Sequence, residues 1–195
     1  SAASDVYKRQ EYDQDSSEFY STIYKAYNMC MVITCAGLIL FDKVIAKILF
    51  GADFYEAWKY APFLMISVVF GALVQLLGGI FSAAKESKAF GNTILIGAAA
   101  NTIMNVAFVY ACGPLGAAIA TSLSYMLIWA LRLYKVTRQM KLDVSLIRDA
   151  LSYVLLYLQA TLLMFYSYNW SGYLIQIGFV VAVFCLLYTS PSPRD

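Results

Sequence analysis

Six long apolar stretches, separated by short polar connections, constrain the fold of this chain more than any other feature. A helix needs about 20 predominantly apolar residues to cross the hydrocarbon core of a bilayer. With 61% hydrophobic and 13% charged residues, the chain has too little charged surface for a soluble domain of 195 residues. We therefore predict an all-α fold, an integral membrane bundle of six transmembrane helices. The stretches cover residues 23–41, 62–84, 90–111, 115–134, 150–168 and 173–188.

The third and fourth stretches are joined by the turn 112–114, in which a glycine and a proline break the helix. Gly97, Asn101 and Asn105 follow one another at intervals of four residues and so share one face of the third helix. Lipid provides no hydrophobic drive between helices, so small residues and interhelical hydrogen bonds must hold them together. The sequence thus predicts a tight transmembrane hairpin whose polar stripe faces other helices. The small-xxx-small pairs of the fourth helix are Gly116 with Ala120 and Ala117 with Thr121.

The connection 42–61 mixes lysines and acidic residues with aliphatic and aromatic side chains. This mixture is typical of amphipathic helices that lie at the membrane surface. We predict two short interfacial helices, broken at Gly51. For the second half, an ordinary loop with snorkelling lysines is an equally acceptable interpretation.

Chemistry-bearing motifs are missing from the sequence. There is no histidine, and we find no hydrolase triad, nucleotide-binding loop or metal-ligand cluster, so we expect no catalytic residues, no metal and no cofactor. The four cysteines lack CxxC spacing and are interpreted as buried, inert thiols. Apart from Lys25, the apolar stretches are predicted to contain almost no ionisable residues, which argues against a proton relay.

Uncharged polar residues recur inside the stretches, and helix–helix hydrogen bonding is their simplest role, with substrate contact as the alternative. One face of the second stretch carries Gly71, Gln75, Gly78 and Ser82, and we place it against protein rather than lipid. The uncharged polar residues are Asn28, Thr34, Gln75, Asn101, Asn105, Thr121, Gln159 and Gln176.

The distribution of Lys and Arg predicts the orientation in the membrane, because cytoplasmic loops carry an excess of basic residues. The second–third and fourth–fifth connections carry seven basic residues, against three in the others. Both termini are therefore predicted to lie in the cytoplasm. The seven are Lys85, Lys88, Arg132, Lys135, Arg138, Lys141 and Arg148, and the three are Lys43, Lys47 and Lys59.

The two ends of the chain differ in composition from the segments beside them. Residues 1–21 are polar and acidic and are predicted to stand apart from the membrane lobe, residues 22–188. The strings at 1–10 and 189–195 resemble mistranslated adapter sequence in assembled environmental reads. We interpret both strings as non-native and give them no functional weight.

Two segments resemble a known family. KILFGADFYEAWKYAPFL, followed by a basic turn and NTIMNVAFVYACGPLGAAIATSLSYML, is similar to the C-terminal half of polysaccharide flippases of the multidrug/oligosaccharidyl-lipid/polysaccharide exporter superfamily. The match includes the two helical asparagines, the glycine turn, the segment 116–121 and the pair Ser124–Tyr125. The chain departs from the family pattern at Val109–Tyr110, where the family has Ile-Pro.

This resemblance implies one six-helix lobe of a two-lobe transporter that works by alternating access, and not an enzyme. Its substrate would be an undecaprenyl-pyrophosphate-linked oligosaccharide, flipped across the cytoplasmic membrane for cell-surface polysaccharide synthesis. The implied partners are the lipid-linked oligosaccharide, membrane lipid and the missing N-terminal lobe, with no nucleic acid.

Three residues are candidates for binding that substrate: Lys25, Asn28 and Gln75. Lys25 is expected to contact the pyrophosphate at the cytoplasmic mouth of the cavity, although a lysine near a helix end also snorkels to lipid phosphates. Two other functions stay open. One is a lobe of a multidrug or cation antiporter, which should carry a carboxylate within its spans. The other is an integral-membrane enzyme of glycan assembly, which needs a large external loop.

Overall fold

The computed structural model describes residues 2–49, 52–83, 87–140, 142–165 and 170–188, with side chains described from 16 onward except at 52–53, 81–83 and 87–90. All regular structure in these residues is helical, which confirms the all-α prediction. Six of the helices are long and apolar enough to cross a membrane. The elements are α1 (Ala2–Leu49), the 3-10 helix η1 (Ala52–Lys59), α2 (Ala61–Ala83), α3 (Ser87–Cys112), α4 (Pro114–Gln139), α5 (Leu146–Phe165) and α6 (Trp170–Tyr188).

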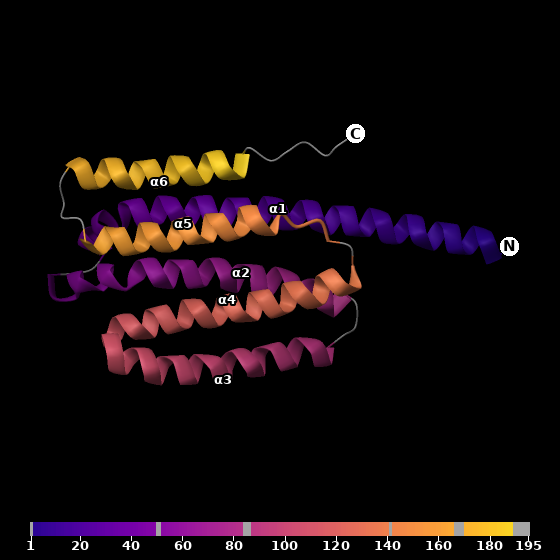
Figure 1. Cartoon of the computed structure of the whole chain (residues 1–195), viewed down its shortest axis with the longest axis horizontal. Coiled ribbons are helices and arrows are strands. Elements are labelled where there is room, and N and C mark those ends of the chain that lie inside the picture. Colours follow the sequence, from indigo (N-terminus) through magenta and orange to yellow (C-terminus); the bar gives the residue numbers. More distant parts are fainter. Residues whose placement is uncertain (1, 50–51, 84–86, 141, 166–169, 189–195) are drawn as a thin grey trace.

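The helices lie side by side along one long axis, with α3 at one edge and α6 at the other (Figure 1). Between these edges α4 packs on α3, α2 packs on α4, and α1 packs on α2, α5 and α6. Short connections make successive helices antiparallel. One end of the bundle therefore holds the starts of α3 and α5 together with the ends of α2, α4 and α6 (Figure 1). We call this the α5-start end.

The α3–α4 hairpin forms as predicted. Gly113 adopts φ 61°, a left-handed conformation that favours glycine, and Pro114 begins α4 directly after it. A Cβ atom on Gly116 would lie 1.9 Å from the carbonyl oxygen of Phe108, so the two helices approach backbone to backbone. Asn101 Nδ2 donates to Ser124 Oγ at 3.1 Å across the hairpin, as expected for an interhelical hydrogen bond.

The apolar core lies where α1, α2, α4 and α5 meet. Its residues follow the helical period, so each of these helices turns one stripe inward. Buried aliphatic and aromatic side chains fill it, because close packing supplies the attraction between helices that lipid does not. The largest fully buried apolar side chains are Tyr24, Phe70, Ile39, Ile66, Leu73, Leu77 and Leu156.

The connection 42–61 is only partly as predicted. Its first half is not a separate surface helix, because α1 continues without a break to Leu49 and buries Asp42 and Ala46. Its second half is the short helix η1, which exposes Phe54 and places Trp58 under the Lys43 ammonium at 4.3 Å from the ring centroid. The expected break at Gly51 lies outside the described residues.

Two further expectations need correction or comment. The polar segment before the first span is helical from Ala2 and runs straight into α1, and it projects beyond the other helices in Figure 1. Cys35 is buried as predicted, but the other three cysteines are exposed on the surface of the bundle, at Cys30, Cys112 and Cys185. Their apolar neighbours in sequence face outward, so an apolar context did not imply burial.

Candidate functional site

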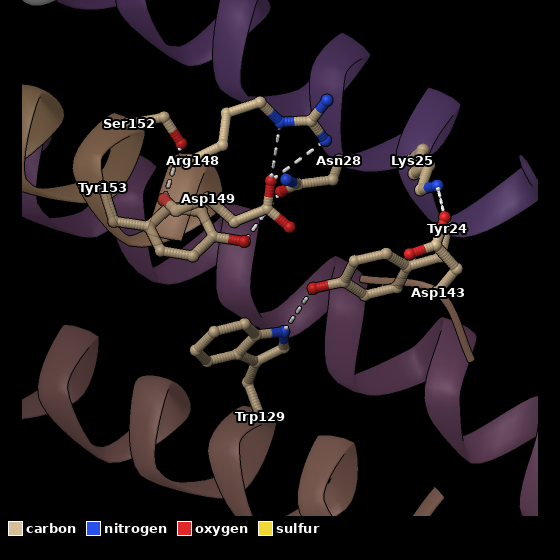
Figure 2. Close-up of polar contacts among 9 residues, drawn as sticks. All are labelled: Tyr24, Lys25, Asn28, Trp129, Asp143, Arg148, Asp149, Ser152 and Tyr153. Atoms are coloured by element: carbon tan, nitrogen blue, oxygen red, sulfur yellow. Dashed lines mark hydrogen bonds and ion pairs between the residues drawn. The ribbon is translucent and has the colours of Figure 1, made fainter. Parts of the chain in front are cut away.

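A cluster of polar side chains lies between α1 and α5 near the α5-start end (Figure 2). Helix α1 provides Lys25 and Asn28, the start of α5 provides Arg148 and Asp149, and the connection before α5 provides Asp143. We call these five residues, with Tyr24, Tyr153 and Trp129, the polar cluster. In a chain that crosses a membrane, ionisable groups on helices mark candidate functional sites.

Asp149 is the buried charge at the centre of the polar cluster. Its side chain is 1% exposed, and Oδ1 accepts from Arg148 Nη2 at 3.2 Å and from Arg148 Nε at 3.3 Å. The Arg148 side chain is itself only 13% exposed. A buried carboxylate is costly unless a cation or hydrogen-bond donors compensate it. The adjacent guanidinium therefore provides the countercharge that lets this carboxylate stay inside the bundle.

Tyr153 and Asn28 connect this charge to the opposite helix. Tyr153 Oη donates to Asn28 Oδ1 at 2.8 Å, and both side chains are buried. Asn28 lies beside the Asp149 carboxylate in Figure 2. One side of the Tyr153 ring packs against Phe70 of α2 and Trp129 of α4, with ring centroids at 4.8 and 5.2 Å. The aromatic packing thus holds the hydroxyl of Tyr153 toward α1.

Trp129 continues the network toward the middle of the bundle. Its Nε1–H donates to Tyr24 Oη at 3.1 Å, so α4 is joined to α1 by a hydrogen bond between two aromatic side chains. Buried indole and phenol groups are usually hydrogen-bonded in this way. The polar cluster therefore reaches from the α5-start end to the aromatic centre of the core.

Lys25 forms the outer part of the polar cluster. Its ammonium pairs with the Asp143 carboxylate, and the backbone N–H of Asp143 donates to Ser21 Oγ at 3.0 Å. The Lys25 side chain is 32% exposed and that of Asp143 is 80% exposed. The connection between α4 and α5 is thereby fastened to α1 at two points.

The structure brings together two of the three predicted substrate-binding residues. Lys25 and Asn28 lie one turn apart on α1 and both join the polar cluster. Gln75 is exposed on α2 and takes no part in the hydrogen bonds of that cluster. On the face of α2 that we assigned to protein contact, Gly78 is buried, Gly71 is partly buried, and the side chain of Ser82 lies outside the described residues.

The expectation that the spans hold almost no ionisable residues is wrong. Asp149 lies inside the membrane-compatible length of α5, and Asp42 is buried in α1 with 1% exposure. Arg132, which we counted in a cytoplasmic loop, is 1% exposed inside α4. It donates from Nη1 to the carbonyl of Val74 at 2.5 Å and from Nε to Thr93 Oγ1 at 3.1 Å, so it joins α4 to α2 and α3.

A signal for Asp149 was present in the sequence. The predicted fifth span begins at residue 150, directly after Asp149, and so leaves Asp149 in the preceding connection. Helix α5 begins at Leu146, and its inward stripe shows Asp149 in register with apolar residues at helical spacing. The buried residues of α5 are Asp149, Ser152, Tyr153, Leu156, Gln159, Ala160 and Leu163.

The predicted helix–helix role of two glutamines is confirmed. Gln159 Nε2 donates to the carbonyl of Ala36 at 3.0 Å, and Gln176 Nε2 donates to the carbonyl of Gln159 at 3.3 Å. These bonds join α5 to α1 and α6 to α5. As for metals, the described residues contain no group of three or more His, Cys, Asp or Glu side chains that could hold an ion.

One comparison with known proteins bears on the fold, and none identifies a family. No protein-family model matches the chain, and no curated protein sequence matches it. Among solved structures, the chain is similar to lipid II flippase MurJ in an inward closed conformation, with a TM-score of 0.63 and 18% sequence identity. The match covers 89% of this chain and 38% of the flippase chain. The six-helix bundle thus has the fold of a little over a third of that transporter.

Proposed function

We propose that this chain is one lobe of a transporter that flips a lipid-linked oligosaccharide across the cytoplasmic membrane for cell-surface polysaccharide synthesis. The observation that carries the proposal is the fold itself. Six membrane-compatible helices align with part of a lipid II flippase over 89% of this chain. The substrate we propose is an undecaprenyl-pyrophosphate-linked oligosaccharide, in keeping with the sequence pattern around Asn101 and Gly116.

The exposed surfaces of the bundle support a second lobe beside α1 and α2. These neighbouring helices expose small or polar residues near their middles, at Cys30, Thr34, Gln75 and Gly79, among larger apolar side chains that include Leu38 and Val68. Helix α3, at the edge of the bundle, exposes large aliphatic side chains typical of a lipid-facing surface. Since a transporter places its substrate between two repeats, we assign the α1–α2 face to the substrate path and the missing N-terminal lobe. The large aliphatic side chains exposed on α3 are Ile94, Leu95, Ile96, Ile103, Val106 and Val109.

We propose Lys25 as a contact of the pyrophosphate and Gln75 as a contact on the α1–α2 face. Lys25 retains 32% side-chain exposure, enough for an anion to reach its ammonium. Asn28 is fully buried one turn further along α1, and we propose that it supports the Lys25 site from within the bundle. An ammonium acts as a point charge on a flexible stem, which suits a headgroup that must also be released.

The proposed orientation places the α5-start end in the cytoplasm, with both termini on that side. Arg132, Lys135, Arg138 and Arg148 all lie at or near this end, where α4 finishes and α5 begins. In a variant whose native cysteines are replaced by serine, cysteines introduced at Arg138 and Ser171, which are both exposed, would test it in intact cells. A membrane-impermeant thiol reagent should label position 171 from outside, and labelling of position 138 would contradict the orientation.

A transport assay tests the substrate. The chain, preceded by a six-helix N-terminal lobe, would be reconstituted into vesicles holding a fluorescent undecaprenyl-pyrophosphate-linked oligosaccharide. We expect the labelled oligosaccharide lipid to move between leaflets more than in protein-free vesicles. Lys25→Gln should reduce this movement at unchanged protein level. Movement that is equal with and without protein would contradict the proposal.

One observation favours a second candidate, a cation-coupled antiporter of the same superfamily. Such a transporter should carry a carboxylate within its spans, and Asp149 and Asp42 are buried there. The same vesicles, loaded with ethidium and given a proton or sodium gradient, distinguish the two. Gradient-dependent ethidium movement without glycan-lipid movement would favour the antiporter.

A further inference from the structure

The connection between α4 and α5 holds a carboxylate, that of Asp143, against the Lys25 ammonium, which we propose as the phosphate contact. The Asp143 carboxylate pairs with Lys25, which lies 118 residues earlier in the chain on α1 (Figure 2). The contact therefore joins two segments that no local constraint brings together. A phosphate group approaching the Lys25 ammonium would meet this carboxylate first.

The backbone of the connection is held in place independently of the ion pair. The Asp143 N–H donates to Ser21 Oγ at 3.0 Å, and Ser21 Oγ donates in turn to the carbonyl of Ser17 at 2.7 Å. Leu142, the preceding residue, is 9% exposed and belongs to the apolar core. These contacts keep the Asp143 side chain near Lys25 even when the two charges separate.

The ion pair itself is weak enough to exchange. The Asp143 side chain is 80% exposed, so water and salt screen it, and exposed pairs of this kind shift an equilibrium by only about 1.4- to fivefold. A diphosphate carries more negative charge than a carboxylate and offers several acceptor oxygens, which makes stronger charge-assisted hydrogen bonds with an ammonium. A phosphate-bearing ligand can therefore displace Asp143.

We propose that Asp143 is a tethered competitor for a phosphate-bearing anion at Lys25. The carboxylate occupies the ammonium when the ligand is absent, and ligand binding frees one of the two contacts that fasten the α4–α5 connection to α1. The inference rests on the proposed function, because it assumes that Lys25 meets a phosphate group. It adds that the affinity of this site is set partly by a residue of the α4–α5 connection.

Binding measurements on the 195-residue chain in detergent micelles test the inference. The probes are farnesyl diphosphate, inorganic pyrophosphate and micelles doped with phosphatidylglycerol, which separate an isoprenyl diphosphate from a free anion and from a phospholipid headgroup. The variants are Asp143→Asn, Lys25→Gln, Lys25→Arg and the double variant Lys25→Gln/Asp143→Asn. Glu56→Gln is the matched control, because Glu56 forms an equally exposed ion pair with Lys59 at 3.0 Å.

Asp143→Asn should lower the dissociation constant of farnesyl diphosphate by about two- to fivefold, because the competitor is gone. Lys25→Gln should weaken binding, Lys25→Arg should retain most of it, and the double variant should bind like Lys25→Gln alone. Glu56→Gln should leave the dissociation constant unchanged. Preference for farnesyl diphosphate over the other two probes would identify a lipid diphosphate as the ligand, and equal binding of pyrophosphate would identify the phosphate group alone.

Three results would overturn the inference. The first is unchanged or weaker binding of farnesyl diphosphate by Asp143→Asn while Lys25→Gln still loses binding. The second is a gain in affinity by Glu56→Gln equal to that of Asp143→Asn. The third is no binding of any probe to either the wild type or Asp143→Asn. None of these decides whether the completed transporter moves lipid-linked oligosaccharide, which the vesicle assay measures separately. A transporter that flips its substrate while Asp143→Asn binds no better would keep the proposed function and reject the competitor.

Discussion

The α3–α4 hairpin and the contact between α1 and α5 are built on different principles. In the hairpin, small residues bring two backbones together, and its interhelical hydrogen bond joins Asn101 and Ser124, 23 residues apart. Between α1 and α5, polar side chains meet across the chain, with Tyr153 and Asn28 125 residues apart and Gln159 and Ala36 123 residues apart. We call this second region, Asn28, Ala36, Asp149, Tyr153 and Gln159, the α1–α5 seam.

Polar satisfaction differs between the two regions as well. Among the described residues, six buried side-chain atoms make no hydrogen bond, and all of them lie on α1, α5 or α6. Three of these atoms belong to the α1–α5 seam, and buried polar groups without partners oppose stability, so the seam is less fully satisfied than the hairpin. We infer that the hairpin is a scaffold, and most of the proposed functional side chains lie along α1 and α5. The six atoms are Asn28 Nδ2, Asp42 Oδ2, Asp149 Oδ2, Tyr157 Oη, Gln159 Oε1 and Gln176 Oε1.

Removing the countercharge of the seam should have the largest effect. Arg148→Met leaves the Asp149 carboxylate buried without its cation, and breaking a buried pair in this way costs roughly 3–5 kcal/mol. The free energy of unfolding in mixed micelles measures it. Arg138→Met is the matched control, because Arg138 is exposed and lies over the Tyr134 ring, so its loss should cost little. Equal losses in the two variants would show that Asp149 does not depend on Arg148.

The hairpin should be disrupted next most strongly by Gly116→Ala. The new Cβ would meet the Phe108 carbonyl oxygen at 1.9 Å, and a backbone atom cannot move aside as a side chain can. We expect a cost of about 2–3 kcal/mol, at the upper end for overpacking. Gly79→Ala, where no atom lies within 4 Å, is the control and should be neutral or slightly stabilising. Unchanged unfolding in both variants would mean that α3 and α4 are further apart.

Tyr153→Phe, in the α1–α5 seam, should lower the free energy of unfolding by a smaller amount. The ring contacts with Phe70 and Trp129 remain, but Asn28 Oδ1 loses the hydroxyl that donates to it at 2.8 Å. Leaving a buried acceptor unpaired costs about 1–2 kcal/mol. Tyr134→Phe, on an exposed tyrosine, should change the unfolding free energy much less. A neutral Tyr153→Phe would argue that water replaces the lost donor.

Gly97→Ala should have the smallest measurable effect. Its Cβ would lie 2.2 Å from Ile128 Cγ1 and 2.3 Å from Cδ1, atoms of a side chain that can change rotamer. We expect about 1 kcal/mol, less than for Gly116→Ala, because the obstacle is flexible. Gly178→Ala, with open space around it, serves as the control in the same unfolding experiment. A larger loss of unfolding free energy for Gly97→Ala than for Gly116→Ala would show that α3 and α4 are in tighter contact at Gly97 than at Gly116.

The same contrast explains what the sequence could predict. The hairpin is local: a turn of glycine and proline, a stripe at intervals of four and small residues were all visible, and the structure confirms them at Gly113, Gly116 and Asn101. The seam is not local. Nothing in the neighbourhood of Asp149 indicates that Asn28 lies beside it or that Tyr153 donates to Asn28, because those contacts depend on how α1 and α5 pack.

The candidate site was predicted in part for the same reason. Lys25 and Asn28 could be singled out because each is a polar residue near the start of an apolar helix. Their partners could not, since Asp143 and Tyr153 are more than a hundred residues away. Asp149 falls just before the predicted span 150–168, and Arg132, although it lies in the stretch 115–134, is counted with the basic residues of a connection, because charged residues are rare inside spans. In the structure each charge has hydrogen-bond partners that allow it inside the bundle.

We propose that this chain is one lobe of a transporter and that the α1–α2 face is its working surface. This proposal can be tested by measuring the movement of undecaprenyl-pyrophosphate-linked oligosaccharide in vesicles, for the chain alone and for the chain joined to an N-terminal six-helix lobe. Alternating access requires one bundle to move against another, so the chain alone should give no movement above protein-free vesicles, and the joined protein should restore it. Movement by the chain alone would contradict the claim.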